Sequence, residues 1–328
     1  MSKLLYCKNQ PVYNVDTNEI LNEALVPYLI LCNPTKEQFT KWMKYRYSAG
    51  SNTFSRMLKS FTFGQGNRKE INDMTYMLSY YDCYWMKDES NPIKFEDVSP
   101  YYSKFWNGTG EYKGGAVPTL YVPGYLSKEW RPNGKLFKEG NLSIEIDCID
   151  LCKQCGIAVE NGRTVSNGIE LDNFTTPDVM LEQADVSGRI DPDDFTEEDV
   201  RDIFGIDGIK MQTIDAIIGN GDRHAGNFGF LKDANTGEIL GMSPLYDFDH
   251  ALDDSSSVVN KYFMQTLLDI EDISYLDEIL RICEAASHSS NEIFVARANY
   301  IYQEIENHRD TIIEDVKCAD GLNIRELF

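Results

Sequence analysis

The stretch that decides the fold reads "GNGDRHAGN" and occupies residues 219–227. It places Asp222 and Asn227 on a glycine-rich turn, directly after an apolar segment, residues 209–218, whose pattern predicts a helix. A second stretch, "YDFDHAL" at residues 246–252, adds carboxylates to an otherwise apolar run. Turn residues alone do not explain this combination, although Asp, Gly and Asn are common turn formers.

Asp222 and Asn227 have the Asp-x-x-x-x-Asn spacing of the protein-kinase catalytic loop. In that loop the aspartate receives the proton of the attacking hydroxyl and the asparagine binds Mg²⁺. Asp247 follows a predicted hairpin, where kinases have the aspartate that binds the metal, and Mg²⁺ prefers hard oxygen ligands. We therefore expect phosphoryl transfer, with His224 orienting the loop and Arg223 pairing with a neighbouring acid.

Together, "GNGDRHAGNFGF" and "SPLYDFDHAL" resemble the catalytic and metal motifs of the HipA-like kinases and, more remotely, those of the phosphatidylinositol kinases. The resemblance covers roughly residues 118–310, and the N-terminal region is similar to the leader of compact HipA-like proteins. It implies an α+β, bilobal protein-kinase-like fold, with a small mixed N-terminal lobe that carries a β-sheet and a mostly helical C-terminal lobe. It also implies use of ATP and Mg²⁺, transfer to a Ser/Thr hydroxyl of a protein, and an antitoxin-type partner.

The resemblance assigns further roles to single residues. Lys138 in "LFKEG" takes the place of the lysine that contacts the ATP phosphates, with Lys135 as the alternative. Glu145 takes the place of the acid that orients this lysine, with Asp147 as the alternative. An acid in the first turn of a helix is also favourable without any such role.

Two loops complete the implied nucleotide site. "VPGYLSKEWR" at residues 122–131 takes the place of the phosphate-covering loop, with Gly124, Ser127 and Lys128 as its candidate residues. Backbone N–H groups near Lys128 would meet phosphate, and Ser127 is the candidate autophosphorylation site. "ELDNFTT" resembles the connector between lobes, so backbone groups of Asp172 and Phe174 would contact adenine.

Glycine, proline and periodicity divide the chain into three regions. We expect a leader region at 1–115, a nucleotide-binding small lobe at 116–175 and a helical catalytic lobe at 176–328. Helical patterns occur at 35–50 and 72–86, and we expect a helix over 142–157 that ends at Gly156. We also expect a hairpin that turns at 235–237 and helix throughout 258–316.

Composition excludes several classes of function. The 328 residues carry a formal net charge of −22, which argues against direct binding of nucleic acid or of an anionic membrane. No long apolar run or secretory signal is present, so we expect a cytoplasmic protein. Cys148, Cys152 and Cys155 follow one helical face, which favours core packing over a metal site.

Three alternatives stay open from the sequence. The substrate of a kinase of this type can be a lipid or small molecule rather than a protein. The chain can also be a pseudokinase that binds nucleotide without transfer. A metal-dependent hydrolase is less favoured, because such sites usually use more than one histidine ligand and just two of the chain's four histidines lie near the motifs. The sequence does not identify the protein substrate.

Overall fold

The computed structural model describes residues 3–46, 76–110, 128–131, 133–140, 142–191, 195–252 and 273–325. Two compact units make up the chain. The first comprises Met1–Leu142, Glu160–Pro192 and Ala225–Ser243, and the second comprises Ser143–Val159, Asp193–His224 and Pro244–Phe328. Gly124 and Ser127 lie outside the described residues. The expected boundaries near residues 115 and 175 stay predictions.

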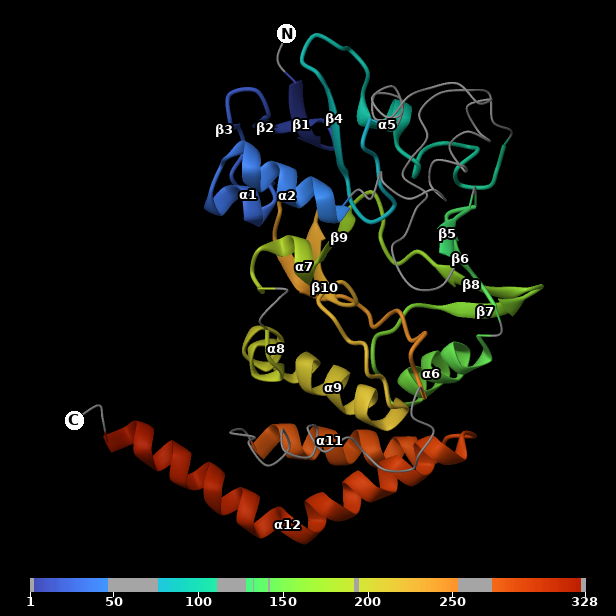
Figure 1. Cartoon of the computed structure of the whole chain (residues 1–328), viewed down its shortest axis with the longest axis vertical. Coiled ribbons are helices and arrows are strands. Elements are labelled where there is room, and N and C mark those ends of the chain that lie inside the picture. Colours follow the sequence, from blue (N-terminus) through green and yellow to red (C-terminus); the bar gives the residue numbers. More distant parts are fainter. Residues whose placement is uncertain are drawn as a thin grey trace. The chain divides into compact units, whose positions relative to one another are not determined.

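The first unit begins with an antiparallel sheet in the order β3-β2-β1-β4 (Figure 1). Its strands are β1 (Lys3–Cys7), β2 (Gln10–Asn14), β3 (Glu19–Ile20) and β4 (Tyr84–Asp88). The expected helix over 72–86 is wrong in its second half, because residues 76–83 form turns and β4 pairs with β1. Pairing with a strand some eighty residues earlier in the chain outweighs the local helical pattern.

Helices pack beside this sheet in the first unit. They are α1 (Tyr28–Cys32), α2 (Lys36–Arg46) and the single turn α5 (Phe95–Val98). The helix expected within 35–50 is confirmed as α2. The Thr35 hydroxyl accepts the N–H of Gln38 at 3.2 Å, which satisfies a donor in the first turn of α2. Trp42 on this helix is 2% exposed and lies edge-on to the ring of Tyr84.

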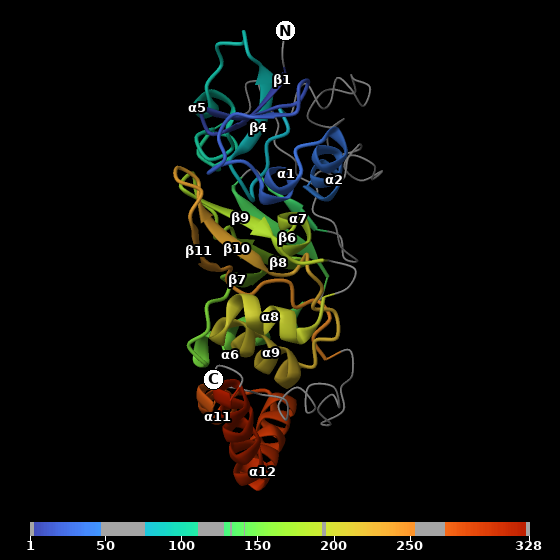
Figure 2. The same ribbon diagram turned by 90° about the vertical axis from the view of Figure 1, so that its left-hand side faces the viewer.

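A second antiparallel sheet of the first unit has the order β5-β6-β8-β7 (Figure 1), and three of its strands, β6, β7 and β8, are also labelled in Figure 2. Its strands are β5 (Lys128–Trp130), β6 (Lys135–Glu139), β7 (Gly162–Val165) and β8 (Gly168–Asp172). Alternate residues share a face, so one face presents the buried side chains of Trp130, Leu136, Ile169 and Leu171. The same alternation places Lys128 and Lys138 on that face.

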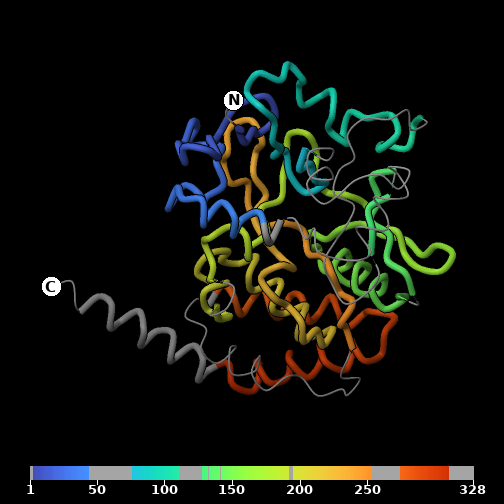
Figure 3. Tube along the Cα trace, turned by 45° about the horizontal axis from the view of Figure 1, so that its top comes forward, coloured from blue at the N-terminus to red at the C-terminus, as the bar shows by residue number. Residues whose placement is uncertain are grey.

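The third sheet has the order β11-β10-β9. Its strands are β9 (Val179–Gln183), β10 (Gly229–Asp233) and β11 (Ile239–Met242), and the short helix α7 (Ala184–Ser187) follows β9. Figure 3 shows the Cα trace of the chain, in which the colour bar locates these residues. The expected hairpin is confirmed. The Asp233 carboxylate accepts the N–H groups of Asn235 and Thr236 at 2.7 and 2.8 Å, which fixes the turn.

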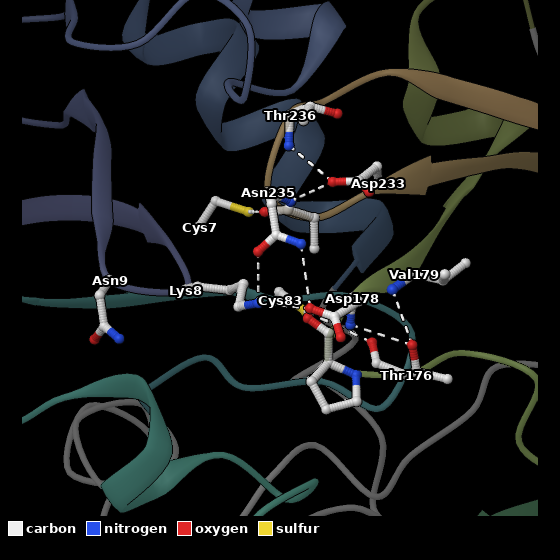
Figure 4. A network of polar contacts seen from close by, with 12 residues as sticks. Cys7, Lys8, Asn9, Cys83, Thr176, Asp178, Val179, Asp233, Asn235 and Thr236 are labelled. Atoms are coloured by element: carbon white, nitrogen blue, oxygen red, sulfur yellow. Dashed lines mark hydrogen bonds and ion pairs between the residues drawn. The ribbon is translucent and has the colours of Figure 1, made fainter.

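A network of polar contacts joins the first and third sheets inside this unit (Figure 4). The Lys8 ammonium donates to the Asp178 carboxylate at 2.9 Å and to the Asn235 amide oxygen at 2.7 Å. Cys7 and Cys83 add weak thiol contacts, at 3.5 Å each, to the carbonyls of Ala234 and Pro177. Residues near the start of the chain are thereby linked to both β9 and the β10–β11 turn.

The second unit contains the helices α6 (Ser143–Gln154), α8 (Glu197–Phe204), α9 (Ile206–Ile218), α11 (Ile273–Ala286) and α12 (Glu292–Arg325). The expected helix over 142–157 is confirmed as α6, and Gly156 with φ +68° closes it. Continuous helix over 258–316 is wrong at residues 287–291. There the Asn291 side chain accepts the N–H of Ile293 and begins α12.

The cysteine face of α6 is part of the core. Cys148, Cys152 and Cys155 are fully buried, which confirms the packing interpretation. The described residues hold no group of three or more His, Cys, Asp or Glu side chains placed to bind a metal ion. In the same residues, no helix combines the length and apolar character that crossing a bilayer requires.

Candidate functional site

The loop that carries Asp222 leaves the end of α9 in the second unit. Gly219 has φ +65° and caps the helix, with its N–H donated to the Asp215 carbonyl. A Cβ on Gly219 would lie 1.8 Å from Nη1 of Arg297, a residue of α12 that is 2% exposed. Both the backbone conformation and the buried guanidinium therefore require glycine at this position.

Arg223 fixes the next part of the loop. Its Nε and Nη2 atoms donate to the two carboxylate oxygens of Asp215 at 2.9 Å each, and Nη1 donates to the Tyr246 carbonyl at 2.7 Å. Burial disfavours the charged guanidinium, but Asp215 outweighs burial and keeps the pKa of Arg223 above its usual value. The expected pairing of Arg223 with an acid is confirmed, and the acid comes from α9.

The acidic segment, residues 244–252, is anchored to the second unit by its backbone. Leu245 donates its N–H to the Ala158 carbonyl at 2.9 Å, and Phe248 donates to the Glu145 carboxylate at 3.5 Å. Leu252 donates to the carbonyl of Ile218, the last residue of α9, at 3.0 Å. The end of α9 therefore holds both the loop that leaves it and the acidic segment.

Asp222 and Asp247 are placed by these anchors. The Asp222 carboxylate is 50% exposed and lies 3.5 Å from the His250 ring. Asp247 is half-buried, has φ +61°, and contributes to the electrostatic stabilisation of Arg223. A left-handed aspartate costs backbone energy that the fixed segment must offset. The part of the first motif that carries Asp222 and the acidic segment thus come together within the second unit.

Asn227 belongs to the first unit, where it precedes β10. It is 4% exposed. The Gln183 amide donates to the Gly226 carbonyl at 2.7 Å, and the N–H groups of Ala184 and Asp185 donate to the carbonyls of Phe228 and Ala225 at 3.0 Å. The corner between β9 and α7 therefore holds the backbone on both sides of Asn227. Gln183 was not among the site residues predicted from the sequence.

Lys138 and Lys128 also belong to the first unit. They are 1% and 6% exposed and directly opposite each other on β6 and β5. Cross-strand residues in an antiparallel pair point to the same side, and like charges in this position repel. The two lysine side chains therefore lie next to each other on one face of this sheet.

Exposure separates the alternatives that the sequence left open. Lys135 lies partly exposed, with its ammonium paired to the Asp172 carboxylate, whereas Lys138 is buried. In the second unit, Glu145 is fully buried and Asp147 is exposed. These differences support Lys138 and Glu145 over their rivals.

The remaining expected residues have simpler surroundings. His224 is exposed, and its backbone N–H donates to the Asp222 carbonyl at 2.9 Å. Phe174 is half-buried in the segment after β8. The neighbouring Asn173 and Thr175 side chains donate to the Tyr80 carbonyl at 3.0 and 2.5 Å, which fixes the backbone on either side of Phe174.

Comparison with known proteins places the fold. No protein-family model and no curated protein matches the sequence. The structure is similar to HipA of Shewanella oneidensis MR-1, solved as a toxin–antitoxin complex of HipA, HipB and operator DNA, with a TM-score of 0.55 and 11% identity over 96% of this chain and 99% of that chain. The kinase CtkA of Helicobacter pylori matches with a TM-score of 0.36 and 16% identity over 62% of this chain and 94% of that chain, and no argument rests on it. Over nearly its whole length, the chain has the fold of the HipA toxin, as its two motifs predicted.

Proposed function

We propose that the protein is a kinase that transfers phosphate from ATP, with Mg²⁺, to a Ser or Thr hydroxyl of a protein. The observation that carries this proposal is the junction, within the second unit, of the Asp222 part of the first motif with the acidic segment. Arg223 links Asp215 on α9 to the backbone next to Asp247, and the end of α9 holds both segments. Such fixed placement of a proton acceptor and a metal-binding carboxylate is what phosphoryl transfer requires.

Each residue then has one task. Asp222 accepts the proton of the attacking hydroxyl, and its 50% exposed carboxylate is open to a substrate. Lys138 binds the phosphates, and Lys128 binds them through its side chain as well as its backbone N–H. Glu145 orients Lys138, His224 orients the loop, and backbone groups of Asp172 and Phe174 bind adenine.

The donor set fits Mg²⁺. Asn227 supplies an amide oxygen and Asp247 a carboxylate, both hard oxygen ligands, and Mg²⁺ commonly takes few protein ligands beside phosphate oxygens. When bound, the ion neutralises negative charge on the transferred group. The protein's contribution is to hold the two oxygen donors, through the β9–α7 corner for Asn227 and through the anchored acidic segment for Asp247.

We further infer that the strand-containing unit and the helical unit correspond to the two lobes of a protein kinase. The likeness to HipA also supports an antitoxin-type protein partner, since that HipA was solved with HipB. The net charge of −22 argues against direct contact of this chain with nucleic acid. Ser127 stays the candidate for autophosphorylation, outside the described residues.

Transfer from γ-labelled ATP tests the proposal. Purified protein is incubated with labelled ATP and Mg²⁺, alone and with a bacterial lysate, beside the Asp222→Asn and Asp247→Asn variants. We expect label on the protein or on a lysate protein, reduced by about 10²-fold or more in each variant. Wild-type transfer by Asp247→Asn would refute the metal assignment.

The same experiment separates the alternative functions. Label on a lipid or metabolite, with none on protein, would indicate a small-molecule kinase. Nucleotide binding without transfer to any acceptor would indicate a pseudokinase.

A further inference from the structure

His250 lies against the candidate proton acceptor. Its Nε2 atom is 3.5 Å from Oδ2 of Asp222, and the two side chains are 29% and 50% exposed. Hydrogen bonds of catalytic groups are often long in structures without substrate and shorten when substrate binds. The contact joins the loop after α9 to the acidic segment, and both belong to the second unit.

The backbone on both sides of His250 is fixed. Before it, Phe248 is fully buried and donates its N–H to the Glu145 carboxylate. After it, Ala251 donates to the Phe248 carbonyl at 3.0 Å, and Leu252 donates to the Ile218 carbonyl at 3.0 Å. Because Ile218 ends the helix from which the Asp222 loop leaves, the position of the imidazole is set by the fold.

The guanidinium next to this contact is bound to other groups. Arg223 follows Asp222 in the chain, but its guanidinium binds Asp215 and the Tyr246 carbonyl. Among the described residues, the ionisable groups of the surrounding segments are Asp215 on α9, Arg223 and His224 on the loop, Asp247 and Asp249 on the acidic segment, and Glu145 on α6. The Asp222 carboxylate and the His250 imidazole can form an ion pair when the ring is protonated.

We propose that His250 is a positioning and proton-relay residue that acts through Asp222, an inference that rests on the proposed phosphoryl transfer. As the substrate oxygen bonds to the γ-phosphorus and the bond to ADP breaks, the hydroxyl proton passes to the Asp222 carboxylate. The neutral imidazole, in the tautomer that carries its hydrogen on Nδ1, then takes that proton at Nε2 and releases it to water. Transfer in this direction is favourable, because imidazole is in general a stronger base than carboxylate.

The first test is the pH profile of His250→Gln, which keeps a polar side chain but cannot titrate. His288→Gln serves as the matched control, since His288 is exposed in the turn between α11 and α12. The rate of Asp222-dependent label transfer from γ-labelled ATP is measured from pH 5.5 to 9. We expect the wild type and the control to lose rate below neutral pH, as the imidazole becomes protonated.

In His250→Gln this acid limb is absent and the rate at pH 8 falls about tenfold, below the ~10²–10⁴-fold of a direct acid or base. A His250→Gln profile equal to that of the wild type would overturn the relay.

The second test needs no activity. The four histidines are followed by NMR as the pH is changed, in the wild type and in Asp222→Asn. We expect the titration midpoint of His250 to fall when the carboxylate is removed. An unchanged His250 midpoint would overturn the inferred contact.

The two tests separate the two proposals. Absence of Asp222-dependent transfer in the wild type would overturn the proposed function and, with it, the relay, and the His250 midpoint would still report whether the contact exists. Transfer that depends on Asp222, with no change in profile or midpoint, would overturn the role of His250 alone.

Discussion

Arg223 and Asp215, eight residues apart, form a two-point ion pair in which each carboxylate oxygen accepts one guanidinium N–H at 2.9 Å. The two side chains are 9% and 11% exposed. The third guanidinium bond, to the Tyr246 carbonyl, extends this pair to the acidic segment. One buried cation therefore fixes a helix, the loop after it and a segment more than twenty residues later.

Removing one partner of this pair should be costly. Asp215→Asn removes the carboxylate that binds the Arg223 guanidinium at two points, so we expect the free energy of unfolding to fall by about 3 kcal/mol. Urea denaturation followed by circular dichroism measures the change. The exposed pair of Lys210 and Asp207 supplies the control, because Asp207→Asn should change stability by less than about 1 kcal/mol. Equal effects of the two substitutions would contradict the structural role of Asp215.

Substitution of the two lysines of β6 tests which of them binds the phosphates of ATP. Lys138→Met should weaken ATP binding by about tenfold, equivalent to ~1.4 kcal/mol, because a buried cation is lost. Lys135→Met should leave the affinity close to that of the wild type, since Lys135 pairs with Asp172 at the surface. Calorimetric titration with ATP and Mg²⁺ measures both. The opposite ranking would move the phosphate contact to Lys135.

A further prediction concerns Lys128, which lies directly opposite Lys138 in the pair of strands β5 and β6. Lys128→Met removes one of the two lysine side chains that we propose bind the ATP phosphates. The rise in melting temperature on adding ATP should be smaller, because one phosphate contact is lost. Thermal unfolding with and without ATP tests this, and an undiminished rise would exclude the Lys128 side chain from the site.

The free energy of unfolding should depend on pH because of Asp185. Burial raises the pKa of this carboxyl group from 3.8 to about 6. Between these values the folded state binds more protons than the unfolded state, so this residue's contribution to stability falls as the pH rises from about 4 to 6. Asp185→Asn should therefore be more stable than the wild type by about 2 kcal/mol at pH 7.5 and nearly equal to it at pH 4.

Denaturation at the two pH values measures the Asp185 effect. Asp178→Asn is the matched control, because the hydrogen bond from Lys8 lowers the pKa of that exposed carboxylate. It should not show the gain at pH 7.5. A gain for Asp185→Asn that is the same at pH 4 would assign the effect to packing rather than to titration.

The cysteines predict chemical behaviour. Burial raises the pKa of Cys155 to about 11 and also raises the pKa values of Cys148 and Cys152. A thiol reagent should therefore react rapidly with the exposed Cys32 and only after unfolding with the α6 cysteines. The reaction is measured in a Cys318→Ser background, with Cys32→Ser as the control. Fast labelling of Cys152 or Cys155 in the folded protein would contradict their place in the core.

Local patterns predicted the parts of the fold that local forces determine. Helix α6 ends where Gly156 can adopt a positive φ, and the β10–β11 hairpin turns where Asp233 binds its own following N–H groups. Residues 84–86 of strand β4 were expected to be helical from their local pattern. The pairing of β4 with β1 depends instead on residues far away in the chain. No local signal carries that information.

The same limit applies to the candidate site. Asp222, Asn227 and Asp247 were identified because they form motifs, and the pairing of Arg223 was expected. Asp215 was not singled out, because an acid within a helical pattern resembles any solvated side chain. Its role depends on contact with the loop after the helix, and the role proposed for His250 depends on a distance across two loops.

The contacts of Lys8 with Asp178 and Asn235 affect how genetic deletions are interpreted. A fragment that starts after residue 115 would lose β1 and β4 and leave the partners of Lys8, Cys7 and Cys83 exposed on the third sheet. Its poor expression or rapid proteolysis would then reflect an incomplete first unit. Loss of activity in such a truncation would therefore say nothing about whether the N-terminal region recognises a target, and point substitutions on its surface are the informative choice.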